Sequence, residues 1–171
     1  MTSAAHMPRG RVLGIDVGTR RTGIALSDPS RSLASPLETV SLDAAALVDH
    51  VAGLARIHEV NTIVIGVPIR PSGDAGEIGT RAQDLADRLR ARLGVEVLLW
   101  NEALSSWEAE EVLRKKKHGG RKPGGRESAA RRRAAAAEID KVAAALILQD
   151  FLDESARRIA REPDERRGGD E

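Results

Sequence analysis

The feature that most constrains the fold is a change in the spacing of apolar residues part-way along the chain. First, three short β-type runs follow one another within residues 11–17, 23–27 and 33–40, separated by turn residues. Then apolar residues at helical spacing alternate with two continuous apolar runs, 62–65 and 95–100. Continuous runs of this length are typical of strands buried on both faces. The pattern predicts an α/β protein in which an antiparallel meander and two parallel strands form one mixed sheet, with helices on both faces.

The helical segments are recognised by apolar residues that recur every three or four positions. Asp43 or Ser41 is the expected N-cap of the first of them, and a Ser105-x-x-Glu108 capping box opens the third. Pro36 places the strand that contains it at an edge of the sheet. The four expected helices cover residues 47–55, 82–93, 105–113 and 139–152.

The length of 171 residues is that of one ordinary domain. We expect this domain at residues 11–153, after a disordered leader at 1–10 and before a charged, disordered tail at 154–171. The absence of cysteine excludes zinc–thiolate sites and thiol catalysis. No apolar run approaches 18 residues, and residues 1–10 lack the apolar stretch of a secretion signal, so we expect a cytoplasmic protein with no membrane partner.

The net charge of +1 conceals an uneven distribution of charge. Residues 114–133 contain ten basic residues and one acid, which gives this segment +9 and leaves −8 on the other 151 residues. Its Gly and Pro residues predict a flexible basic loop, suited to holding a phosphate backbone without reading sequence; a solvated surface loop is the alternative. The candidate contacts to nucleic acid are Lys115, Lys116, Lys117, Arg121 and Lys122 in this loop, with Arg20, Arg21 and Arg81 outside it.

Three acidic residues stand where solvation alone would not place them. Asp16 lies between Ile15 and Val17 in the first apolar run, Glu102 follows the last apolar strand, and Asp140 borders the apolar stripe of the last helix. Ligands of α/β sheets gather where strands end, and converging carboxylates need cations between them. Oxygen ligands suit Mg²⁺ or Mn²⁺, which can activate water for phosphodiester hydrolysis. The alternatives are a solvent-facing edge strand for Asp16 and capping roles for the other two acids.

Four sequence blocks, in this order, resemble the YqgF/RuvX family. They are GIDVGTRRTGIA at 14–25, IGVPI at 65–69 with Gly73 and Arg81, NEALSSWEA at 101–109, and IDKVAAALIL at 139–148. The resemblance implies an RNase H-like fold, related to that of the Holliday-junction resolvase RuvC. It implies a nuclease that matures the 5′ end of pre-16S ribosomal RNA, with Asp16, Glu102 and Asp140 as catalytic, metal-binding residues. Resolution of Holliday junctions is the alternative activity that it implies.

One block departs from the family pattern. The family usually has Asp-Glu-Arg where this chain has Asn101-Glu102-Ala103. The central Glu is kept, but the chain lacks the Arg side chain, and with it an ion pair or a phosphate contact. The Asp is replaced by an amide that still accepts hydrogen bonds. A weaker or differently tuned activity is therefore expected.

Three functions remain open at this point. The first is a metal-dependent nuclease, which would need to be a homodimer to resolve a four-way junction symmetrically. The second is a nucleic-acid-binding protein of the same fold without catalytic activity, to which Ala103 draws attention. The third is an ATPase or sugar kinase, because Asp16-x-Gly18-Thr19 resembles the first phosphate loop of the actin–hexokinase group. That group closes two such domains over ATP, whereas this sequence predicts one.

Overall fold

The computed structural model describes residues 10–67, 76–101 and 129–161. Its five strands form one sheet in the order β3-β2-β1-β4-β5. β1, β2 and β3 are antiparallel neighbours, whereas β4 runs parallel to β1 and to β5. The predicted mixed sheet is therefore confirmed. The elements are β1 (Arg11–Val17), β2 (Thr22–Ser27), β3 (Ala34–Val40), α1 (Ala44–Ile57), β4 (Val60–Val67), α2 (Gly76–Arg92), β5 (Glu96–Asn101) and α4 (Ala129–Arg161).

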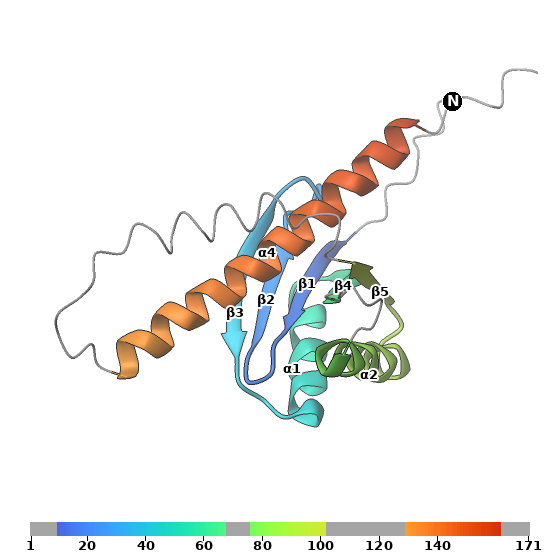
Figure 1. Ribbon diagram of the computed structural model, residues 1–171. Coiled ribbons are helices and arrows are strands. Elements are labelled where there is room, and N and C mark those ends of the chain that lie inside the picture. The colour runs from blue at the N-terminus through green and yellow to red at the C-terminus, as the bar shows by residue number, and fades with distance from the viewer. Residues whose placement is uncertain (1–9, 68–75, 102–128, 162–171) are drawn as a thin grey trace, which may run out of the picture.

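Helices cover both faces of this sheet, as predicted (Figure 1). Successive residues of a strand point to opposite faces, so Leu13 and Ile15 of β1 join α1 and α2 in one buried cluster. Val12 points the other way and packs with Ala144 and Leu148 of α4. The central strands thus bury both faces, which explains their continuous apolar runs.

The short elements lie close to their expected positions. Asp43 is the N-cap of α1, and its Oδ1 accepts a hydrogen bond from the Ala46 backbone N–H at 2.9 Å. β3, which contains Pro36, is an edge strand, as expected. The expected helix at 105–113 lies outside the described residues, as do the leader at 1–9 and the basic segment up to residue 128.

α4 is much longer than the sequence indicated. It begins at Ala129 and ends at Arg161, so residues 129–133 of the expected loop and residues 154–161 of the expected tail are helical. The extra turns are rich in Ala, the strongest helix former. Near the end of α4, Glu154 pairs with Arg158 at 3.2 Å, at a spacing that stabilises helices. The charged residues at both ends of α4 therefore belong to a helix and do not indicate disorder.

Side-chain hydrogen bonds fix the position of α4 along the meander. The Ala34 backbone N–H donates to Gln149 Oε1 at 2.8 Å, and the Thr39 hydroxyl donates to the Ala137 carbonyl at 2.6 Å. Trp100 Nε1 on β5 donates to Asp150 Oδ2 at 2.8 Å. Both edges of the sheet therefore hold the helix. None of the helices within the described ranges is both long and apolar enough to cross a membrane.

Candidate functional site

Asp16 lies on the central strand and is flanked by glycines. Its Cα partners are Gly23 on β2 and Gly66 on β4, and Gly66 pairs in turn with Trp100 on β5. Asp16 shares a sheet face with Val12, which packs against α4. The half-buried carboxylate thus faces α4, with no side chain beside it from either neighbouring strand. The alternative of a solvent-facing edge strand was wrong, because β1 is the third of five strands.

Asp140 reaches the same face because α4 packs directly on glycine. A Cβ added to Gly23 would lie 2.1 Å from the Asp140 carbonyl oxygen, and one added to Gly14 would lie 2.7 Å from Leu148 Cβ. The helix backbone therefore touches the sheet at Gly23, the register partner of Asp16. Such antiparallel partners have Cα atoms about 4.5–5.5 Å apart. The structure therefore places the Asp140 backbone against Gly23, one strand spacing from Asp16, whereas Glu102 lies outside the described residues.

Arg21 makes an ion pair with Asp140. Its Nε lies 2.7 Å from Asp140 Oδ2, with both side chains about one-third exposed. The contact lacks the alignment of a hydrogen bond, and the buried Oδ2 has no hydrogen-bond partner among the residues that the structure describes. Arg21 ends the loop that joins β1 to β2, and its carbonyl accepts a hydrogen bond from the Gly18 N–H at 2.9 Å.

The two carboxylates fit a divalent metal ion. Both are oxygen ligands, which Mg²⁺ and Mn²⁺ prefer, and within the described residues the buried Oδ2 of Asp140 accepts no hydrogen bond and is met only by the Arg21 ion pair. The described ranges contain no group of three acidic, His or Cys side chains that could hold a metal. A complete site therefore needs a further ligand, for which Glu102, directly after β5, is the sequence candidate.

The other predicted basic residues are only partly placed. Arg81 on α2 donates from Nη1 to the Thr19 carbonyl at 2.8 Å, which ties α2 to the β1–β2 loop. Arg20 in that loop is exposed, as are Arg131 and Arg133 at the start of α4. The loop candidates Lys115, Lys116, Lys117, Arg121 and Lys122 lie outside the described residues.

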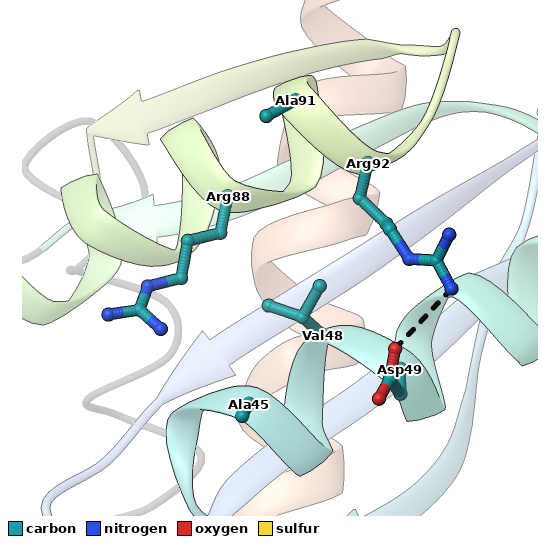
Figure 2. Close-up of a pocket in the computed structure, with 6 residues that line it drawn as sticks. All are labelled: Ala45, Val48, Asp49, Arg88, Ala91 and Arg92. Carbon is teal, nitrogen blue, oxygen red and sulfur yellow. Dashed lines mark ion pairs between the residues drawn. The ribbon is translucent and has the colours of Figure 1, made fainter.

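A shallow pocket of about 400 Å³ lies elsewhere, between α1 and α2 (Figure 2). Arg92 on α2 reaches over it toward Asp49 on α1, with 3.6 Å between Nη2 and Oδ1. These two helices cover the sheet face opposite α4. The pocket is therefore separate from the carboxylates. It is lined by Ala45, Val48, Asp49, Arg88, Ala91 and Arg92.

Gly23 is the positioning residue that the sequence analysis missed. Gly23 lies in the block GIDVGTRRTGIA at 14–25, which resembles the family, but no role was assigned to it. A glycine in the interior of a strand often marks the close approach of another backbone, and that signal was available. It did not reveal that the approaching backbone belongs to Asp140, 117 positions further along the chain.

The mixed five-stranded sheet in the order β3-β2-β1-β4-β5, with helices on both faces, is the fold of RNase H-like proteins. The solved structure titled "T. thermophilus RuvC in complex with Holliday junction substrate" has a similar fold. Its TM-score is 0.51 and its sequence identity 15%, over 86% of this chain and 96% of that chain. The match therefore supports the fold.

The family model described as "RuvX: Holliday junction resolvase" matches residues 10–154, and this chain belongs to the RuvX family. A Roseiflexus protein named "Putative pre-16S rRNA nuclease" is 39% identical over 145 residues, which cover 84% of this chain and 94% of the relative. A relative with the same name from Halalkalibacterium halodurans is 38% identical, over 84% of this chain and 96% of its own length. The predicted family and fold are thus confirmed.

Proposed function

We propose that this chain is a divalent-metal-dependent nuclease that hydrolyses phosphodiester bonds in structured RNA. The precursor of 16S ribosomal RNA, at its 5′ end, is the proposed substrate, which places the activity in the cytoplasm. The observation that carries the proposal is the seating of Asp140 on Gly23, beside Asp16, on one face of the sheet. Membership of a family of nucleases and the names of two relatives support the substrate class.

Asp16, Asp140 and Glu102 are the residues we propose to hold Mg²⁺ or Mn²⁺. A bound ion of this kind supplies an activated water and charge stabilisation for the leaving oxygen. Asp16 is fixed by a central strand and Asp140 by a helix that hydrogen bonds join to both sheet edges. Their separation is therefore set by the fold before substrate binds, as catalytic preorganisation requires.

The beginning of α4 is suited to contact the phosphate backbone. Arg133 precedes Asp140 by seven residues, or two helical turns, so the two lie on the same side of α4 about 10 Å apart. Arg131 and Arg133 are exposed. The lysines and arginines of residues 114–128 precede them directly in sequence. We propose that this basic segment and Arg20 hold the backbone while the carboxylates act on one phosphodiester.

Substitution of Arg131 and Arg133 tests the proposed contact to the phosphate backbone of RNA. Arg131→Gln with Arg133→Gln should weaken RNA binding and lower the slope of log K against log salt by about 1.5, because each phosphate contact contributes about 0.7–0.9. Arg157→Gln with Arg158→Gln makes the same charge change at the other end of α4 and should leave the slope unchanged. Filter binding between about 50 and 300 mM salt measures both slopes. Equal slopes for the two double variants would contradict a phosphate contact at residues 131–133.

A direct assay tests the activity. Purified protein is incubated with precursor 16S ribosomal RNA and, separately, with a four-way DNA junction, in Mg²⁺, in Mn²⁺ and in excess chelator. We expect cleavage of the RNA near its 5′ end that requires the metal. Binding without cleavage in any metal would support the non-catalytic alternative instead.

The four-way junction is the second candidate substrate. The description of the family model and the fold of RuvC favour it. Symmetric cleavage of a junction needs two active sites related by a two-fold axis, so this alternative also requires a homodimer. Paired cuts in the junction, with the RNA left intact, would favour it over the proposed ribosomal substrate.

A further inference from the structure

We propose that Arg21 is a built-in counter-ion that competes with the divalent metal for Asp140, so that metal binding releases its guanidinium toward the substrate phosphate. This role rests on the proposed function, because it assumes that Asp140 is a metal ligand. It gives Arg21 a task that Arg20, its neighbour in the same loop, does not share.

The backbone of Arg21 is held by the β1–β2 loop, whereas its side chain is partly exposed and is held at its end by an ion pair. The Gly18–Arg21 hydrogen bond closes the β1–β2 loop, and Arg81 ties the loop to α2 through the Thr19 carbonyl. Within the described part of the chain, Asp140 is the only ion-pair partner of the Arg21 guanidinium. The side chain is one-third exposed. A rotation about its own bonds can therefore move the charge without moving the loop.

The guanidinium and a metal ion would meet at the same oxygen. Arg21 Nε lies 2.7 Å from Asp140 Oδ2, and Mg²⁺ binds a carboxylate oxygen at about 2.1 Å. If both bound this oxygen, the metal ion and Arg21 Nε would lie at most about 4.8 Å apart, where two positive charges repel each other. Within the described residues Oδ2 accepts no hydrogen bond, so the ion pair is its polar contact with Arg21. A metal ligated by this oxygen would therefore displace the guanidinium.

Once displaced, the Arg21 guanidinium could bind the phosphate of the substrate. An arginine presents several donors in a planar fork that matches phosphate, and this one starts beside the carboxylate that we propose holds the metal. The coupling is reciprocal by thermodynamic linkage. Arg21 weakens metal binding, and the metal weakens the hold of Asp140 on Arg21. The site would then have its highest metal affinity when phosphate holds the arginine away from Asp140.

The test is Mn²⁺ affinity, measured by calorimetry in the absence of nucleic acid. Arg21→Gln should tighten Mn²⁺ binding by about fivefold, the upper part of the range for partly exposed ion pairs. Arg20→Gln removes the same charge from an exposed neighbour and should change the affinity by less than about twofold. Arg21→Lys keeps a charge near Asp140 and should restore the wild-type value. As a second readout, the melting temperature of Arg21→Gln should rise at lower Mn²⁺ concentrations than that of the wild type.

The outcomes separate this role from the proposed function. Equal Mn²⁺ affinities for Arg21→Gln and Arg20→Gln, or weaker Mn²⁺ binding by Arg21→Gln, would contradict the counter-ion role. Neither result would contradict the metal site itself. Mn²⁺ binding that is absent, or that Asp140→Asn leaves unchanged, would contradict the metal site of the proposed function and the counter-ion role with it.

Discussion

Asp16→Asn and Asp140→Asn should each lower metal-dependent cleavage on the order of a thousandfold or more, the scale of loss seen when a central catalytic group is removed. Asparagine keeps the size of the side chain but removes the negative charge that holds a cation. Both residues lie on rigid elements at the Gly23 contact. Single-turnover cleavage at saturating Mg²⁺ measures the loss.

The fold should survive both substitutions. The Arg21–Asp140 pair is partly exposed, so its loss should change the free energy of unfolding by less than about 1 kcal/mol. Asp153→Asn is the matched control, because Asp153 is an exposed acid on the same helix, bonded to Gln149. It should cleave like the wild type. Near-normal cleavage by either site variant, with normal circular dichroism, would remove that carboxylate from the catalytic site.

Much of the fold followed from local patterns. The alternation of Leu13 and Ile15 with Val12 in β1 distributes side chains between two buried clusters, and only a central strand needs apolar residues on both faces. Asp43 starts α1 through a local hydrogen bond. Such features depend on neighbours in sequence, so the sequence could reveal them.

The site depends on contacts that no local pattern contains. Whether Asp16 faces solvent or a helix depends on β4 pairing beside β1. The Arg21–Asp140 pair joins positions 119 residues apart. The length of α4 was underestimated because its ends carry charge and few apolar residues, while tertiary contacts and alanine stabilise the helix. The resemblance implied which acids form the site, but only the packing of α4 on Gly23 explains how Asp140 lies on the same sheet face as Asp16.

Gly23→Ala should disrupt the contact between β2 and the α4 backbone at Asp140, although it adds a single methyl group. The new Cβ would lie 2.1 Å from the Asp140 carbonyl oxygen, 2.5 Å from the Asp140 carbonyl carbon and 3.1 Å from the Lys141 backbone nitrogen, all of them backbone atoms. α4 must therefore shift by more than about 1 Å to restore normal contact distances. We expect a loss of about 2–4 kcal/mol in the free energy of unfolding. We also expect a fall in cleavage on the order of a hundredfold, because Asp140 moves with the helix.

Gly53→Ala makes the same chemical change where the structure has room. Gly53 lies inside α1, and a Cβ there would meet no atom within 4 Å. Because alanine favours a helix interior over glycine, this variant should gain about 0.5–1 kcal/mol and keep full activity. Thermal unfolding and single-turnover cleavage of both variants measure the contrast. If Gly23→Ala were as stable and as active as Gly53→Ala, the close contact between β2 and α4 could not be what positions Asp140 beside Asp16.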